Sequence, residues 1–178
     1  MAELTIKQYK WQRIMQHLPS SALGATVFSK FLHYVDPPLM HISKDRLSIP
    51  SLLTGLPVVI LTCTGAKSGQ ARTKPVVGIP DGDNVVLVAS NWGQGRNPAW
   101  YYNLRANHVA ELEFGGNSGT YTAQEVTEPD EYQRLWQKAA GVYIGFDKYQ
   151  GRAGIRKIPI MVLAPQAEKQ IYGGSAPH

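Results

Sequence analysis

The sequence has little cysteine, few charges and no long hydrophobic run, and each shortage excludes a class of protein. Cys63 is the single cysteine in 178 residues, so no internal disulfide can form and a reducing, cytoplasmic compartment is expected. No stretch of eighteen apolar residues occurs, and the N-terminus lacks the pattern of a signal peptide, so we expect neither a membrane-spanning helix nor a leader. Charged residues make up 17% and hydrophobic residues 43%, which is typical of a globular protein.

Signatures of several common functional sites are missing as well. The five histidines are scattered and no Cys/His cluster has metal-ligand spacing, so no metal site is expected. The sequence contains no Gly-x-Ser-x-Gly elbow, no Walker loop and no Gly-x-Gly-x-x-Gly after a strand. No nucleic-acid-binding motif is present, so no nucleic-acid partner is expected. Cys63 lies in an apolar strand pattern, which favours a buried, inert thiol over a nucleophile.

The first 50 residues are predicted to form a helical extension. Apolar residues recur at helical spacing from Trp11 to Val35, and Asp36-Pro37-Pro38 ends the pattern. Lys7, Lys10 and Arg13 give the first helix a basic side, and the chain as a whole has a net charge of +5. A basic amphipathic helix can lie on an anionic bilayer, although such a face is often simply solvated. Peripheral membrane contact through this helix therefore stays open.

From Pro57 onward the pattern changes to strands. β-branched and apolar runs, separated by Gly, Pro and Asp turns, predict strands at 58–64, 72–79, 85–89, 109–114, 119–126 and 158–163. A helix is expected from about 98 to 107 with Asn97 as its N-cap, and another after Thr127 as N-cap. These elements predict an α+β fold in which about six mostly antiparallel strands form a small barrel with helices packed on it. We assign the barrel to residues 51–168 and a C-terminal tail to 169–178.

The turn between the first two strands has the composition of an anion site. Gly65-Ala66-Lys67-Ser68-Gly69-Gln70-Ala71-Arg72 combines exposed backbone N–H groups, a hydroxyl and two cations in one short arc. Such groups suit a phosphate or a carboxylate tail. An ordinary hairpin with basic residues at its tip is an equal alternative.

A second cluster runs from Ala89 to Leu104. A buried strand ends there in a loop of small residues that leads into a helix N-terminus. Small residues let a planar ring approach the backbone, and amide groups can bind its polar edge. Trp100 and Tyr101 serve as core aromatics or as cofactor support in this interpretation, and the sequence alone does not choose.

A third cluster consists of Tyr143, Phe146 and Tyr149, which we expect in a loop after the late helix. Aromatic side chains at this spacing can pack on the mouth of a barrel or form the wall of a pocket for a flat substrate.

Taken together, the clusters resemble the deazaflavin-dependent nitroreductase family of split β-barrel oxidoreductases. The resemblance rests on Gly65-x-Lys67-Ser68-Gly69-x-x-Arg72, the Asp81-Gly82 hairpin, Ala89-Ser90, and Asn97-Pro98-x-Trp100-Tyr101-x-Asn103-Leu104. Looser agreement extends to Ile158-Pro159-Ile160, so about two thirds of the chain is covered. Two departures are Trp92, where many relatives have a second glycine, and Phe146, where some have a tyrosine.

The resemblance implies coenzyme F420, a deazaflavin with a phosphate and an acidic tail. Lys67, Ser68 and Arg72 would hold the tail and phosphate. The ring would be lined by Lys74, Pro75 and Val77, met at its edge by Val88, Ala89, Ser90 and Asn91, and closed in by Ala99, Trp100, Tyr101 and Asn103.

The resemblance also implies an oxidoreductase that transfers a hydride from reduced F420 to an electrophilic small molecule such as a quinone, an enone or a nitroaromatic. Ser90, Tyr143 and Tyr149 are the catalytic candidates, because a hydroxyl can donate a hydrogen bond to the acceptor oxygen as charge develops. The alternatives are an FMN-dependent split-barrel oxidoreductase and a non-catalytic protein that binds a deazaflavin or an apolar ligand. A monomer and a homodimer are both compatible with such a barrel.

Overall fold

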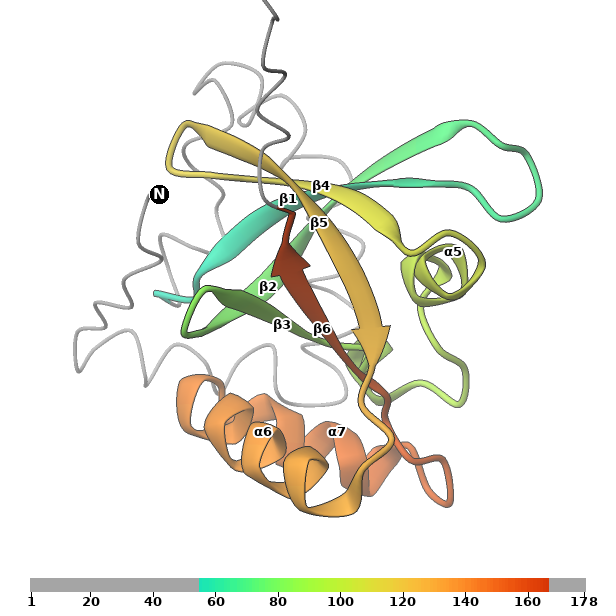
Figure 1. The fold of residues 1–178 in the computed structure, drawn as a ribbon. Helices are drawn as coiled ribbons and strands as arrows, with labels where there is room; N and C mark the ends of the chain where they lie inside the picture. Colours follow the sequence, from blue (N-terminus) through green and yellow to red (C-terminus); the bar gives the residue numbers. More distant parts are fainter. Residues whose placement is uncertain (1–54, 167–178) are drawn as a thin grey trace, which may run out of the picture.

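The described part of the chain, residues 55–166 of a computed structural model, is built around a closed six-stranded barrel (Figure 1). The strands are β1 (Val58–Thr64), β2 (Ala71–Asp81), β3 (Asn84–Val88), β4 (Val109–Phe114), β5 (Asn117–Glu125) and β6 (Ile160–Pro165). Their order around the barrel is β1-β2-β3-β6-β5-β4, and pairing of β1 with β4 closes it. Every pairing is antiparallel, which confirms the predicted α+β barrel.

The predicted N-terminal helices and C-terminal tail lie outside the described residues. The predicted barrel boundaries of 51 and 168 also fall there, so the division of the chain stays a prediction. Among the residues that are described, no helix has the length and apolar content needed to cross a bilayer.

Strand β3 shows how the sequence pattern builds the barrel. All of Val85, Val86, Leu87 and Val88 are buried, as the unbroken apolar run predicts. Because side chains alternate along a strand, Val85 and Leu87 point into the barrel, whereas Val86 and Val88 pack in a second core on its outer face. β3 is therefore covered on both sides, and the residues that follow it start from a fixed position.

Helices close both cores. Helix α5 (Ala99–Ala106) adds Tyr101 and Leu104 to the barrel interior. Helices α6 (Pro129–Val142) and α7 (Gly145–Arg152) cover the outer core, and Figure 1 shows them together on one side of the barrel, with α5 on another. The outer core includes Ile79, Val86, Leu135, Ala139, Phe146, Tyr149 and Ile160.

Three local predictions are corrected by the structure. The aromatic cluster predicted in a loop lies on α7 and at its approach, because Phe146, Tyr149 and Ala153 fall on one helical face and pack inward. Glu128, not Thr127, caps α6, and its carboxylate accepts a hydrogen bond of 2.7 Å from the backbone N–H of Glu131. Asn97 does not cap α5 either, since Pro98 is the N-cap residue and makes no side-chain cap bond.

Candidate cofactor site

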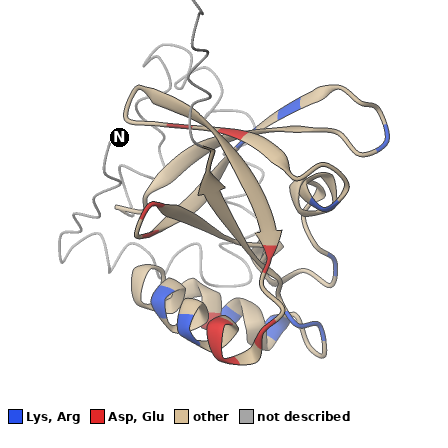
Figure 2. Ribbon diagram, in the orientation of Figure 1, with Lys and Arg blue, Asp and Glu red and all other residues tan. Residues whose placement is uncertain are grey.

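The turn between β1 and β2 is compact and exposed. The Gly65 N–H donates to the Gln70 carbonyl at 2.8 Å, and the Gly69 N–H donates to the Gly65 carbonyl at 2.8 Å. Gly69 has a φ of 66°, which glycine adopts without strain. Figure 2 shows Lys and Arg positions along the projecting hairpin, and residues 65–75 contain no acidic side chain.

The predicted anion-binding side chains lie at this turn. Lys67, Ser68 and Arg72 are all exposed, and the Arg72 Nη2 donates to the Ser68 Oγ at 3.3 Å. The two cations and the hydroxyl face solvent on a segment with no competing carboxylate, as an acidic ligand requires. The donor set therefore fits a phosphate or carboxylate group.

Asn103 on α5 joins the turn to the helix. Its Oδ1 accepts a hydrogen bond of 3.0 Å from the Ala66 N–H, and its Nδ2 lies 3.7 Å from the Sγ of Cys63. Burial raises the pKa of the Cys63 thiol, so this sulfur stays protonated. The side chain of Asn103 thus brings two sequence motifs, 38 positions apart at Gly65 and Asn103, into one place.

The predicted ring-lining residues on β2 change in exposure along the strand. Lys74 and Pro75 are exposed, while Val77 is half-buried against the outer core. β2 pairs with β1 over residues 71–77 and with β3 from Gly78 onward, so its exposed surface lies in the half near the turn.

The loop after β3 is fixed by backbone geometry. It contains a short 3-10 turn, η1 (Asn91–Gly93), in which Asn91 and Trp92 have positive φ angles of 46° and 59°. Gly93 has a φ of 77°, and a Cβ there would lie 3.0 Å from the Tyr149 carbonyl oxygen and 3.0 Å from the Arg152 Cβ. The loop can pack on α7 this closely only with glycine at this position.

Arg156, which the sequence analysis did not select, holds the same loop. Its guanidinium donates to the carbonyls of Ser90 at 3.0 Å, Gln94 at 2.8 Å and Ala89 at 3.4 Å, and also to the Oδ1 of Asn97. A single cation therefore ties the end of β3, η1 and the approach to α5 together. The signal for this role in the sequence is weak, because an arginine in a polar loop is ordinarily solvated.

The three catalytic candidates divide into two environments. Ser90 is half-buried at the start of η1, and its hydroxyl makes no hydrogen bond within residues 55–166. Tyr143 and Tyr149 are 4% and 2% exposed, and their hydroxyls share a hydrogen bond of 2.6 Å. Burial raises the pKa of Tyr143 to about 12 and also raises that of Tyr149. Both phenols are therefore protonated donors at neutral pH.

Residues of the second sequence cluster have different surroundings. Val88 and Ala89 are buried, Asn91 donates from its Nδ2 to the Arg96 carbonyl at 3.0 Å, and Ala99 is exposed. Trp100 is partly buried against the barrel core.

Tyr101 packs inside that core. Its hydroxyl donates to the two carboxylate oxygens of Glu125, each at 3.0 Å, so its ring supports the barrel rather than facing the loop.

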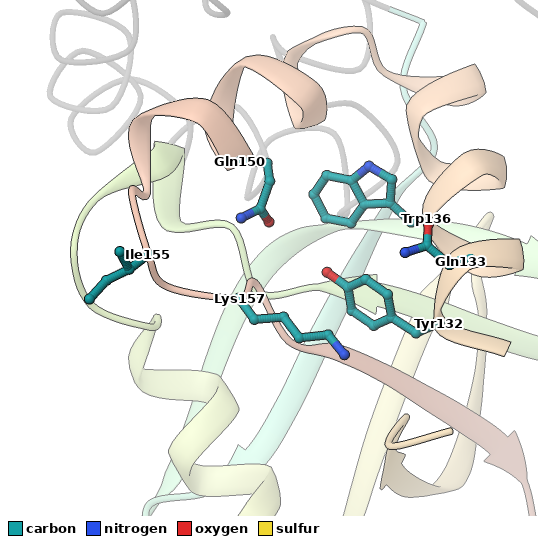
Figure 3. Close-up of a pocket in the computed structure, with 6 residues that line it drawn as sticks. All are labelled: Tyr132, Gln133, Trp136, Gln150, Ile155 and Lys157. Atoms are coloured by element: carbon teal, nitrogen blue, oxygen red, sulfur yellow. The ribbon is translucent and has the colours of Figure 1, made fainter. Parts of the chain in front are cut away.

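A shallow pocket of about 370 Å³ lies elsewhere, between α6, α7 and the segment before β6 (Figure 3). It is lined by Tyr132, Gln133, Trp136, Gln150, Ile155 and Lys157. Two of its polar side chains are already hydrogen-bonded within the protein. The Tyr132 hydroxyl donates to the Ile158 carbonyl, and the Gln150 amide donates to the Arg156 carbonyl. None of the predicted site residues lines it. Within residues 55–166, no group of three or more acidic, His or Cys side chains is arranged to hold a metal ion.

Comparison with known proteins identifies the family. The family model for F420H(2)-dependent quinone reductases matches residues 41–165. An F420H(2)-dependent quinone reductase of Mycobacterium tuberculosis is 39% identical over 109 residues, which are 60% of this chain and 72% of that protein.

Two solved structures agree with this match. One is an F420-H2 dependent reductase (FDR-A), which is 32% identical, covers 60% of this chain and 93% of its own, and superposes with a TM-score of 0.56. The other, described as a domain-swapped dimer, is 28% identical, covers 74% of this chain and 97% of its own, and has a TM-score of 0.58. The chain therefore belongs to the F420H(2)-dependent quinone reductase family, which confirms the F420-dependent oxidoreductase and the cofactor predicted from its motifs.

Proposed function

We propose that this protein reduces a quinone with electrons from reduced F420 bound between the β1–β2 turn, α5 and the loop after β3. The observation that carries the proposal is the hydrogen bond from the Ala66 N–H to the Asn103 side chain, which joins an exposed cationic turn to α5. Membership of the family and the name of the mycobacterial relative support the choice of cofactor and acceptor.

In this proposal the acidic end of the cofactor binds at the turn. Lys67 and Arg72 neutralise the phosphate and the carboxylates, and Ser68 adds a hydroxyl donor. Support comes from their exposure and from the absence of Asp and Glu in residues 65–75. Charge-assisted hydrogen bonds of this kind are about twice as strong as neutral ones.

The deazaflavin ring would be held by β2 and the loop after β3. Lys74, Pro75 and Val77 would line it, Val88, Ala89, Ser90 and Asn91 would meet its edge, and Ala99, Trp100 and Asn103 would close the site. Tyr101 supports this wall from the barrel core, since its ring is buried and its hydroxyl is bound to Glu125. Arg156 keeps the carbonyls of the loop in place.

When bound in its reduced form, F420 supplies the hydride. The protein orients the acceptor and donates hydrogen bonds to the acceptor oxygen on which negative charge develops. The Ser90 hydroxyl and the Tyr143–Tyr149 phenol pair are the donors that we assign to this task. The raised pKa of Tyr143, about 12, supports it because the phenol keeps its proton at neutral pH.

The direct test is turnover with defined partners. Purified protein is mixed with reduced F420 and menadione, and oxidation of the deazaflavin is followed by absorbance, beside a matched reaction with reduced FMN. We expect oxidation of F420 that depends on both protein and menadione. Activity with FMN alone would show that the protein is an FMN-dependent oxidoreductase. Binding of F420 without turnover would show that it is a non-catalytic carrier.

The oligomeric state and the cellular location of the protein are also proposals. A monomer and a homodimer were both expected, and a solved relative described as a domain-swapped dimer supports the homodimer. Light scattering after size exclusion measures this directly. The cytoplasmic location and the membrane contact predicted for the N-terminal helix remain predictions, because that helix lies outside the described residues.

A further inference from the structure

Arg152, at the end of α7, has a guanidinium edge with no partner among residues 55–166. Its Nε and Nη2 are buried, and neither makes a hydrogen bond within this part of the chain. These two nitrogens carry the parallel N–H groups of the guanidinium fork, the pair that binds two oxygens or straddles one. Burying charged donors without acceptors is costly, and such groups in a native protein call for an explanation.

The surroundings of Arg152 do not supply the missing partner. The guanidinium Cζ lies 4.8 Å from the centroid of the Tyr149 ring. Among residues 55–166 Arg152 forms no ion pair, and its charge acts on the phenols of Tyr143 and Tyr149. A cation over a ring is stabilising, but the ring face does not satisfy the two N–H groups.

The position of Arg152 connects it to the acceptor side of the proposed site. The Arg152 Cβ would lie 3.0 Å from a Cβ at Gly93, so the residue borders the loop that begins at Ser90. The cationic turn of Lys67 and Arg72 belongs instead to the β1–β2 hairpin. Arg152 therefore lies on a different element from Lys67 and Arg72. The acidic tail of the cofactor has these two cations as partners and does not need Arg152.

We propose that Arg152 binds the acceptor oxygen that becomes anionic during the reaction. The inference rests on the proposed function and deepens it. A hydride brings two electrons and one proton to the quinone, one ring oxygen takes the resulting negative charge, and a proton from water completes the hydroquinone while the deazaflavin is left oxidised. The guanidinium fork stabilises the oxyanion, beside the hydroxyls of Tyr143 and Tyr149.

The test uses binding to the protein without cofactor. The ligands are menadione, which is neutral, and hydroxynaphthoquinone, whose ring hydroxyl is ionised at neutral pH. Binding is followed by quenching of tryptophan fluorescence, because the Trp92 ring lies 6.1 Å from that of Tyr149. We expect the anion to bind about ten-fold tighter than menadione, as a charge-assisted hydrogen bond implies.

Substitution of Arg152 separates this role from a structural one. We expect Arg152→Met to lose the preference for the anion. Arg152→Lys should keep only part of it, because an ammonium lacks the paired N–H groups of the guanidinium. Lys157→Met is the matched control, since the Lys157 Nζ also lies over a tyrosine ring, 4.0 Å from the Tyr132 centroid, and it should keep the full preference. Arg152→Met should also melt no lower than the parent, because it removes an unsatisfied buried charge.

Three results would overturn the inference. One is an equal preference for the anion in the parent and in Arg152→Met. Another is a lower melting temperature of Arg152→Met, which would give Arg152 a structural partner. The third is an Arg152→Met variant that binds F420 more weakly but binds hydroxynaphthoquinone as the parent does. Arg152 would then bind an anionic group of the cofactor and not the acceptor. Failure of the parent to bind F420 at all would refute the proposed function, while the naphthoquinone comparison still decides the role of Arg152.

Discussion

At the scale of single residues, the site is held by side chains that bind backbone atoms. Asn103 accepts from a turn N–H, and Arg156 donates to three carbonyls. The cationic turn was predicted from its composition, and Asn103 from the resemblance to the family. Arg156 and Arg152 were not predicted, because the surroundings of each are set by how α7 and the segment before β6 pack, and no local sequence pattern encodes that packing.

Replacing Arg156 by lysine tests whether its guanidinium fixes the loop after β3. A lysine keeps the charge but cannot reach the carbonyls of Ser90 and Gln94 together with Asn97, so the loop loses its fixed form. We expect F420 to bind about ten-fold more weakly, because loop ordering is then required on binding. Fluorescence titration measures the loss, and circular dichroism checks that the fold is kept. Unchanged affinity of Arg156→Lys for F420 would show that the bonds of Arg156 to the loop are not needed for cofactor binding.

At the scale of elements, the strand pattern was enough to predict the barrel. All six strands were expected within a few residues of their positions, since β-branched runs and glycine turns are local signals. Helix α7 was missed because it is only eight residues long and contains Gly145 and Gly151, which have poor helix propensity. Its helical form comes from burying Phe146 and Tyr149, a tertiary effect.

Two glycines of the loop after β3 provide a matched test of how the loop packs on α7. Gly93 has a φ of 77° and would bring a Cβ to 3.0 Å from the Tyr149 carbonyl, whereas a Cβ at Gly95 meets no atom of the described residues within 4 Å. Gly93→Ala should therefore destabilise the protein by about 1–3 kcal/mol, and Gly95→Ala should be close to neutral. Chemical denaturation of the two variants measures the difference. Equal stability would show that the contact between the loop and α7 is dispensable.

The junction of α6 with the β2–β3 turn predicts a dependence on pH. Arg134 and Lys138 contact the Asp81 carboxylate at 2.6 Å each and lower its pKa from 3.8 to about 2. Because the folded pKa is depressed, this stabilisation is complete above pH 4 and is lost as pH falls towards 2. Both cations are substantially exposed, so the contribution is about 1 kcal/mol.

Asp81→Asn should thus lower the melting temperature by about 2–4 °C at pH 7 and by much less near pH 2. Asp83→Asn is the control, because Asp83 lies exposed on the same turn and forms no ion pair among residues 55–166. A loss in Asp81→Asn that is the same at both pH values would argue against the ion pairs as its cause.

At the scale of the whole molecule, function depends on bringing together motifs that lie far apart in the sequence. The barrel places the β1–β2 turn beside α5, and the outer core places the loop after β3 on α7. The sequence motifs predicted the cofactor and the family, because their spacing is specific. For Tyr101 the sequence left core packing and cofactor support open, since an aromatic residue on an amphipathic helix can face either way, and the structure places its ring in the barrel core.

A titration of oxidised F420 with the purified protein, followed by deazaflavin fluorescence beside a matched FMN titration, tests the proposed cofactor site. We expect saturable binding of F420 and not of FMN. We also expect an affinity loss of at least ten-fold when Lys67 and Arg72 are both changed to alanine, and little change in Lys157→Ala, whose cation lies over Tyr132 at the separate pocket. Binding of F420 that does not depend on Lys67 and Arg72 would contradict the proposed site, and absence of F420 binding would contradict the proposed function itself.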